Sequence, residues 1–191
     1  MRQAEAHLPT IYGDFKIIAY ADDPADPMPN VALLHKKFDA AEAAVVRIHS
    51  ECMTGDVFSS SKCDCGEQLH QSLKMIAEAK GILIYLRQEG RGIGLINKLK
   101  AYQLQEKGLN TIDANLHLGF QEDQRQYINA VEILKDLNIN NIRLITNNPL
   151  KIAALQKVGF HVTERIPIVI PPQQDNKSYL QVKRDLMGHL I

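Results

Sequence analysis

All three cysteines of this chain fall in one short stretch, at Cys52, Cys63 and Cys65. If the three cysteines act together, the fold must bring Cys52 close to the other two, which a hairpin or loop allows. Cys63 and Cys65 are one residue apart, so a turn can point both thiols at one metal ion. Thiolates suit Zn²⁺, and three protein ligands leave a fourth position for water or substrate. The stretch therefore predicts a zinc site.

The same cysteines have other interpretations. Free cysteine is a common buried apolar residue, so the three could simply be core thiols, and redox chemistry is a further alternative. His49 lies just upstream and could act as a fourth ligand, which would make the site closed and structural. A disulfide framework is disfavoured, because the count is odd and the chain is long. Spacing alone leaves catalytic and structural metal sites open.

The 191 residues suit one domain, or one domain with a tail, and we expect the domain to cover 1–170 and a C-terminal tail to cover 171–191. No apolar run approaches the roughly 20 residues that span a membrane, and the N-terminus lacks the apolar segment of a signal peptide. With unpaired cysteines, this predicts a cytoplasmic protein. The 22 basic and 22 acidic residues cancel, and only 6% of residues are aromatic, which disfavours nucleic-acid binding. An anionic ligand would need a local cluster of cations.

Hydrophobic patterns give a coarse order of elements. Apolar or alternating runs predict strands at 15–20, 31–35, 44–49, 81–86, 142–146 and 160–165. Helical spacing predicts helices at 69–80, from about 95 to 107, at 124–137 with Asp123 as its cap, from Pro149 to about 158, and at 179–190. We expect a loop at 115–123. Strands first and then strand–helix alternation predict a single α+β or α/β domain with a mixed β-sheet flanked by helices. Such sheets place ligands where strands lead into helices.

One such connection is Glu89-Gly-Arg-Gly-Ile-Gly94, which follows the apolar strand at 81–86. Its glycines allow backbone N–H groups to approach an anion at a helix start. Arg87 and Arg91 add guanidinium groups suited to phosphate. The spacing matches neither the Walker A sequence nor the dinucleotide-binding fingerprint. Phosphate binding is favoured over a tight turn with solvated arginines.

Other polar residues are ambiguous from their pattern. Tyr102 shares a helical stripe with Leu95 and Leu99, which is typical of a core residue. Arg125 is unexpected in a first helical turn, where cations are disfavoured, and an anion would explain it. Thr146 and Lys151 flank a strand-to-helix turn and could be polar loop residues or a second anion contact. Together these residues favour hydrolysis at a carbon of a phosphorylated substrate, beside a metal.

Longer motifs then point to one family. These motifs are Arg47-Ile-His-Ser-Glu-Cys52, Lys62-Cys-Asp-Cys-Gly66, Arg87-Gln-Glu-Gly-Arg-Gly-Ile-Gly-Leu95 and Thr146-Asn-Asn-Pro149. Together they resemble GTP cyclohydrolase II, the first enzyme of riboflavin biosynthesis, and the resemblance covers nearly the whole chain, including Met187-Gly-His189. The resemblance implies a homodimer that uses Zn²⁺ and Mg²⁺. It implies hydrolysis of GTP to 2,5-diamino-6-ribosylamino-4(3H)-pyrimidinone 5′-phosphate, formate and pyrophosphate.

The resemblance also implies roles for individual residues. Cys52, Cys63 and Cys65 would hold Zn²⁺, whose water would attack C8 of guanine. Asp123 would accept a proton, Arg125 would attack or clamp the α-phosphate, and Tyr102 would lie near the ring-opening chemistry. The implied contacts with GTP are Arg47, Ile48, His49, Ser50, Glu51, Gln68, Glu89, Gly90, Arg91, Thr111, Thr146 and Lys151.

The chain departs from the family pattern at Ser61-Lys62, where a Leu-Arg pair is common. Lysine keeps the charge but loses the bidentate fork, so a contact there would be weaker. Two further hypotheses remain beside the enzyme. One is a nucleotide sensor that keeps the fold without turnover. The other is a zinc-stabilised nucleic-acid-binding module, against which the balanced charge argues.

Overall fold

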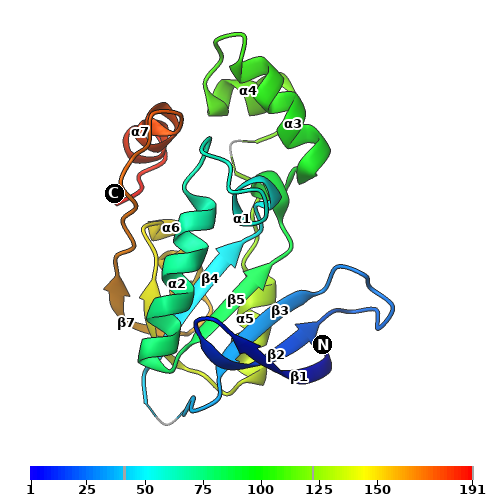
Figure 1. The fold of residues 1–191 in the computed structure, drawn as a ribbon, viewed down its shortest axis with the longest axis vertical. Helices are drawn as coiled ribbons and strands as arrows, with labels where there is room; N and C mark the ends of the chain where they lie inside the picture. The colour runs from blue at the N-terminus through cyan, green and yellow to red at the C-terminus, as the bar shows by residue number, and fades with distance from the viewer. Residues whose placement is uncertain (41, 122, 191) are drawn as a thin grey trace.

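The computed structural model describes residues 1–40, 42–121 and 123–190, and it is built on a seven-stranded mixed sheet (Figure 1). The strands are β1 (Arg2–Thr10), β2 (Gly13–Tyr20), β3 (Asn30–His35), β4 (Ala44–Ser50), β5 (Ile82–Leu86), β6 (Asn141–Ile145) and β7 (His161–Ile166). They lie in the order β1-β2-β3-β5-β4-β6-β7. The pairs β1-β2, β2-β3 and β3-β5 are antiparallel. The pairs β5-β4, β4-β6 and β6-β7 are parallel. The predicted mixed sheet is confirmed.

Helices cover both faces of this sheet (Figure 1). They are α1 (Met53–Asp56), α2 (Cys65–Ala79), α3 (Gly94–Gln105), α4 (Thr111–His117), α5 (Ile128–Asp136), α6 (Pro149–Lys157) and α7 (Lys177–Asp185), with a 3-10 turn, η1, at Glu89–Gly92. One core cluster joins α2, through Ile76, to β4 and β5. The other joins α5 and α6 to the opposite face of the same strands.

The two central strands explain why their sequences are continuously apolar. Residues 44–49 of β4 are all buried, and so is most of β5. A parallel strand with helices on both faces has no solvent-facing side, so the usual alternation of polar and apolar residues is lost. The polar exceptions on β4 are Arg47 and His49, which are buried near its carboxyl end.

The carboxyl ends of the parallel strands point toward the end of the molecule where α1, α3 and α4 lie (Figure 1). Strand β4 has β5 on one side and β6 on the other. The chain passes from β4 through α2 to β5, and then from β5 through α5 on the opposite face to β6, so the two crossovers diverge at β4 and open a crevice beyond its end. The chain after β7 returns to this end as α7, so the C-terminal segment lies beside the same crevice.

Some predicted bounds differ from the structure. Residues 115–117 of the loop expected at 115–123 belong to α4, which begins at Thr111 because the Asn110 side chain caps it by accepting from the Ile112 and Asp113 N–H groups. Asp123 does not cap α5, which begins at Ile128; its carboxylate instead accepts the Arg125 N–H in a separate turn. The rest of the expected loop includes residue 122, outside the described residues.

The N-terminal strand β1 was not predicted. It is an exposed edge strand with few buried side chains, so its sequence lacks a hydrophobic face to reveal it. The last helix ends at Asp185 instead of about residue 190. Within the described ranges, no helix has the length and apolarity needed to span a membrane.

Candidate active site

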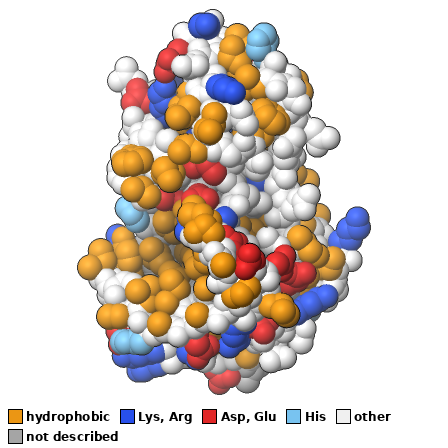
Figure 2. Space-filling view, turned by 90° about the vertical axis from the view of Figure 1, so that its right-hand side faces the viewer, with side chains coloured by type: hydrophobic (Ala, Val, Ile, Leu, Met, Phe, Trp, Pro, Cys, Tyr) orange, Lys and Arg blue, Asp and Glu red, His pale blue; other side chains and the backbone are white. Residues whose placement is uncertain are grey.

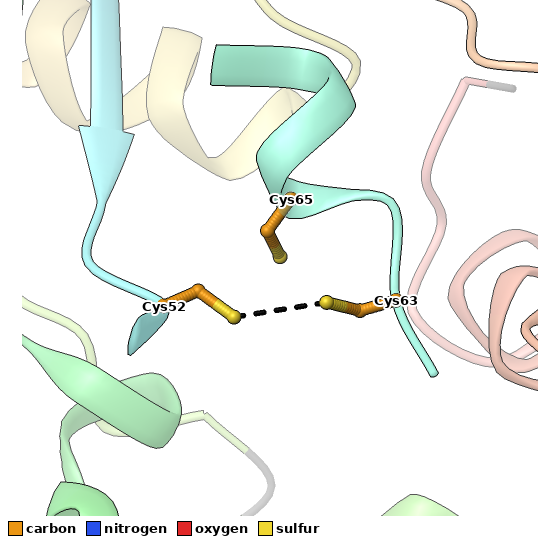
Figure 3. Close-up of side chains that lie close together, drawn as sticks. All are labelled: Cys52, Cys63 and Cys65. Carbon is orange, nitrogen blue, oxygen red and sulfur yellow. Dashed lines mark hydrogen bonds between the residues drawn. The ribbon is translucent and has the colours of Figure 1, made fainter. Parts of the chain in front are cut away.

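The three cysteine side chains converge at the end of β4 (Figure 3). Cys52 precedes α1, Cys63 lies in the loop that follows, and Cys65 begins α2. Their Sγ atoms lie within 4.8 Å of one another, and those of Cys52 and Cys63 are 3.7 Å apart. Tetrahedral thiolates around Zn²⁺, each about 2.3 Å from the ion, lie about 3.8 Å apart. The cluster therefore fits a metal ion of this kind.

Two glycines allow the cysteine-bearing segments to come this close. A Cβ atom on Gly66 would lie 2.2 Å from the Gly55 carbonyl oxygen, and one on Gly55 would lie 3.0 Å from the Cys63 Sγ atom. Neither position has room for a side chain. The turn at α1 and the start of α2 are thus packed backbone against backbone, which fixes the separation of the thiols.

Lys98 on α3 is a charged neighbour of the cluster that the sequence did not single out. Its buried Nζ donates to the Cys52 Sγ atom at 3.1 Å and to the Glu89 carboxylate at 2.8 Å. Hydrogen bonds from the other two thiols, helped by Lys98, lower the pKa of Cys52. The Cys52 sulfur in turn raises the pKa of Cys63 to about 11. One thiolate is therefore favoured even before a metal binds.

His49 does not join the cluster of possible ligands in the described part of the chain. Its Nε2 atom lies 3.1 Å from both carboxylate oxygens of Asp56. Asp56 also accepts from the Cys52 N–H at 3.0 Å and from the Tyr85 hydroxyl at 2.8 Å. Burial lowers the pKa of His49, so the ring is neutral. His49 and Asp56 thus support the Cys52 turn, and a closed site with His49 as fourth ligand is not formed.

The glycine-rich connection after β5 wraps around Glu89. The Glu89 carboxylate accepts from the Met53 N–H at 2.6 Å and from the Gly90 N–H at 2.7 Å, in addition to Lys98. Gly90 and Arg91 both adopt the left-handed conformation, with φ of 62° and 63°. That conformation is disfavoured for arginine. The Arg91 guanidinium lies 5.7 Å from the centre of the Tyr179 ring on α7.

A chain of polar contacts links β4 to the C-terminal helix. The buried Arg47 guanidinium donates to the Gln68 side chain at 2.7 Å, and Gln68 donates to Asp64 at 2.5 Å. Asp64 accepts from Lys183 of α7 at 2.7 Å. Burial lowers the pKa of Arg47 to about 10 despite the nearby carboxylate of Asp64. The positive charge of this guanidinium is therefore only partly compensated by the carboxylates around it.

Lys151 at the start of α6 is a second buried cation. Its Nζ donates to the Ile48 carbonyl oxygen at 2.7 Å. Burial, reinforced by the charges of Arg47 and Arg125, lowers its pKa well below the ordinary value. A buried lysine perturbed in this way is a candidate for binding an anion, which would restore its charge. Thr146, buried at the end of β6, accepts from the Asn148 N–H and shapes this turn.

Asp123 and Arg125 form a close ion pair before α5. The Nε and Nη2 atoms of Arg125 donate to both carboxylate oxygens of Asp123. Burial would raise the pKa of Asp123, but Arg125 outweighs it and lowers the pKa. Burial would likewise lower the pKa of Arg125, and Asp123 raises it. Both groups are therefore charged.

Most of these groups, though not Asp123, line one pocket. Its walls include every site residue predicted from the sequence except Ile48 and Asp123. The Ile48 side chain is buried in the core, and only its carbonyl oxygen reaches Lys151. Asp123 stays behind Arg125. Thr111, on the first turn of α4, and Tyr102, on α3, complete the wall opposite the sheet.

The pocket also contains residues that the sequence analysis did not predict. They include Lys98, Asn148, Tyr179, Lys183 and His189. Lys98 is one helical turn from Tyr102, and Tyr179 is one turn from Lys183. Residues four apart lie on the same face of a helix, so this spacing is a sequence signal that could have found Lys98 from Tyr102. Asn148 caps α6 through its side-chain oxygen. A metal-capable cluster and several buried cations thus share one pocket, which can hold a metal ion and an anionic substrate together.

Comparisons with known proteins agree with this combination. The sequence model of the family "GTP cyclohydrolase II" matches residues 1–167. The chain belongs to the GTP cyclohydrolase II family. It is 51% identical over all 191 residues to a riboflavin biosynthesis protein RibBA of Bacillus mycoides strain KBAB4, covering 48% of that protein. It is equally identical to a RibBA of Cytophaga hutchinsonii, covering 47%.

The chain thus spans about half the length of these relatives. Among solved structures, it is similar to RibBX of A. baumannii, a two-domain 3,4-dihydroxy-2-butanone 4-phosphate synthase. That likeness has a TM-score of 0.44 and 19% identity, and it covers 90% of this chain and 40% of the other.

Proposed function

We propose that the chain catalyses the GTP cyclohydrolase II reaction, which converts GTP to 2,5-diamino-6-ribosylamino-4(3H)-pyrimidinone 5′-phosphate, formate and pyrophosphate. The observation that carries the proposal is one pocket with a three-thiolate cluster and buried cations, in a chain of this family. Opening the guanine ring needs an activated water, and releasing pyrophosphate needs stabilised phosphate charge. The two parts of the pocket suit these two tasks.

Zn²⁺ is the proposed metal, held by Cys52, Cys63 and Cys65. The spacing of their sulfur atoms supports this ion. The neutral His49 ring is hydrogen-bonded to Asp56, so it leaves the fourth ligand position open. When bound, Zn²⁺ would supply an open position at which water is activated. Lys98 offsets part of the negative charge of the thiolates, which favours activation. Mg²⁺ is proposed to accompany the phosphates of the substrate, as is usual for nucleotides.

Asp123 and Arg125 are proposed as the catalytic pair at the α-phosphate. Their ion pair holds the guanidinium in one orientation at the pocket wall, which supports a role in stabilising the developing phosphate charge. Direct attack by Arg125 is the bolder form of the proposal, because its raised pKa keeps the guanidinium protonated. In that form the guanidinium would first lose a proton, and its nitrogen would bond to the α-phosphorus as the bond to pyrophosphate breaks. Asp123 is the adjacent acceptor for a proton.

Tyr102 is proposed to act near the ring-opening chemistry. It lines the pocket on α3, one turn from Lys98, whose Nζ lies 5.8 Å from the centre of its ring. Burial raises the pKa of Tyr102 to about 12, so its hydroxyl stays protonated at neutral pH. It can therefore donate a hydrogen bond to an oxygen or nitrogen of the opening ring.

The remaining site residues predicted from the sequence are proposed to bind GTP. They are Arg47, Ile48, His49, Ser50, Glu51, Gln68, Glu89, Gly90, Arg91, Thr111, Thr146 and Lys151. Burial of Arg47 and Lys151 without full compensation supports phosphate contacts there. Glu89 already accepts three internal hydrogen bonds, so contact with the guanine base would require it to exchange one of them. Its first role would then be to hold the loop around Gly90.

We propose a homodimer located in the cytoplasm. Hydrophobic side chains are exposed over the upper, middle and lower parts of the face in Figure 2. Phe58 after α1 is 70% exposed and Ile96 on α3 is 72% exposed. Exposed apolar side chains of this size support association with a second copy.

The test is a product assay on the purified, metal-loaded protein with GTP and Mg²⁺. Loss of the purine absorbance, with formate and pyrophosphate in equal amounts, is expected. Pyrophosphate without formate would point to an incomplete relative with a defective metal centre. Binding of GTP with neither product would support the nucleotide sensor instead.

A further inference from the structure

The C-terminal segment, residues 177–190, contributes four side chains to the pocket. They are Tyr179, Lys183, Met187 and His189. This segment lies beyond residue 167, where the match to the family model ends. It comes from the far end of the chain, yet it lies across the crevice from the sheet (Figure 1). Its residues therefore add a wall to a site whose other walls belong to the family match.

Specific contacts hold this segment on the pocket. The Leu190 N–H donates to the Asn147 carbonyl oxygen at 2.9 Å. The Lys183 Nζ donates to Asp64 at 2.7 Å and lies 4.5 Å from the centre of the Tyr179 ring. Asp64 stands between Cys63 and Cys65, so Lys183 connects the segment to the cysteine loop.

Cations from separate parts of the fold meet at this wall. Burial and the charges of Lys183, Arg125, Arg91 and Lys151 together lower the pKa of His189 to about 3. These four cations come from the tail, from the turn before α5, from η1 and from α6. Two of them, Lys183 and Arg125, pair with the carboxylates of Asp64 and Asp123. Four cations that line one pocket suit an anion with several charges.

We propose that the C-terminal segment binds the triphosphate of GTP, with Lys183 as the contact residue that moves between Asp64 and the phosphates. The inference rests on the proposed function and deepens it. The flexible ammonium group of lysine suits such an exchange, since it donates three hydrogen bonds in any direction. Asp64 then sets the resting position of Lys183 and competes with the phosphates for it.

The first test is equilibrium binding by calorimetry to the metal-loaded protein. The probes are a non-hydrolysable α,β-methylene analogue of GTP, inorganic tripolyphosphate, and guanosine, which has no phosphate. In Lys183→Met, affinity for the analogue and for tripolyphosphate should fall about 10- to 100-fold, the worth of one charge-assisted hydrogen bond. Affinity for guanosine should stay unchanged. Arg184→Met removes an exposed cation from the same helix and should change none of these affinities.

The second test separates a phosphate contact from a purely structural one. Asp64→Asn keeps the size of the side chain and an oxygen that can accept from Gln68. It removes the negative charge that holds Lys183. The proposal expects tripolyphosphate to bind more tightly to Asp64→Asn, opposite in sign to Lys183→Met. If the contact only anchors the tail, both variants will weaken all three probes together, and the proposal fails.

Two further outcomes are also decisive. Unchanged affinities in a folded Lys183→Met variant would overturn this inference while leaving the proposed function intact. A wild-type protein that binds neither the GTP analogue nor tripolyphosphate would overturn the proposed function itself. Should Lys183→Met fail to fold, Asp64→Asn with its predicted gain still decides the question.

Discussion

The metal half and the cation half of the pocket are built in different ways. The metal half comes from one segment, residues 52–65, closed by the packing of Gly55 against Gly66. The cation half draws Arg47, Arg125 and Lys151 from elements that lie far apart in the sequence. Local chain geometry is enough for the first half. The second depends on the whole sheet topology.

The halves also differ in how well the protein compensates their charges. Around the cysteines, Lys98, Glu89 and Asp56 each make several internal hydrogen bonds. In the cation half, burial lowers the pKa of Arg47 and of Lys151. The comparison indicates that the metal half is organised before the substrate arrives, whereas the cation half is completed by an anion.

The largest expected effect is complete loss of formate when the metal half of the pocket is broken. Cys63→Ser should abolish formate release, because the three-thiolate site is broken, while pyrophosphate release continues. Formate and pyrophosphate are measured in parallel from the same reaction. Formate at the wild-type rate in this variant would contradict the assignment of the metal site.

Arg125→Lys is the matching variant in the other half. It keeps the charge but loses the bidentate pairing with Asp123. Pyrophosphate release should fall on the order of 100-fold or more, the usual cost of removing a preorganised charge contact in a transition state. Zinc content, measured by metal analysis, should be unchanged. A variant that loses zinc as well would mean that the halves are not separable.

A smaller effect is expected from the glycines of the metal half. Gly66→Ala would place a Cβ atom 2.2 Å from the Gly55 carbonyl oxygen, so the backbone must move. We expect a loss of stability of about 1–3 kcal/mol, measured by thermal or chemical unfolding of the metal-loaded protein. Gly55→Ala, with its nearest contact at 3.0 Å, should cost less. The reverse order would refute this packing argument.

The burial of Lys151 predicts a dependence of stability on pH. Because its folded pKa is lowered, the unfolded chain binds more protons between that value and the ordinary value of 10.5. This group therefore makes the ligand-free protein more stable as pH rises through that window. Lys151→Met removes the effect and should unfold at a higher temperature than wild type near neutral pH. The difference should shrink toward pH 10, and a constant difference would count against a buried, perturbed lysine.

The smallest effect is expected at Lys62, which departs from the common arginine of the family. Its Nζ pairs with Glu106 at 2.8 Å, and both side chains are largely exposed. Such pairs contribute about 0–1 kcal/mol. Lys62→Arg should change stability within that range and turnover by less than about threefold, since it keeps the charge near Tyr102. A large change in turnover would give position 62 a direct role.

The same contrast explains what the sequence could and could not predict. The cysteine cluster was readable because its spacing is local, and the strands β4 and β5 because their burial makes them continuously apolar. Lys183 and His189 were missed because their pocket positions depend on how the chain folds back after β7. Asp123 was misread as a helix cap, since a carboxylate before a helix has the same pattern whether it caps or pairs with Arg125.

The central claim is that both halves act on one substrate molecule. The most direct measurement replaces the metal with Co²⁺ and follows its visible absorption during titration with the α,β-methylene analogue of GTP. We predict that the analogue changes the Co²⁺ spectrum with a stoichiometry of one per chain, because phosphate binding brings guanine to the metal. Tripolyphosphate should bind without that spectral change. An unaltered spectrum at saturating analogue, with binding verified by calorimetry, would contradict the claim.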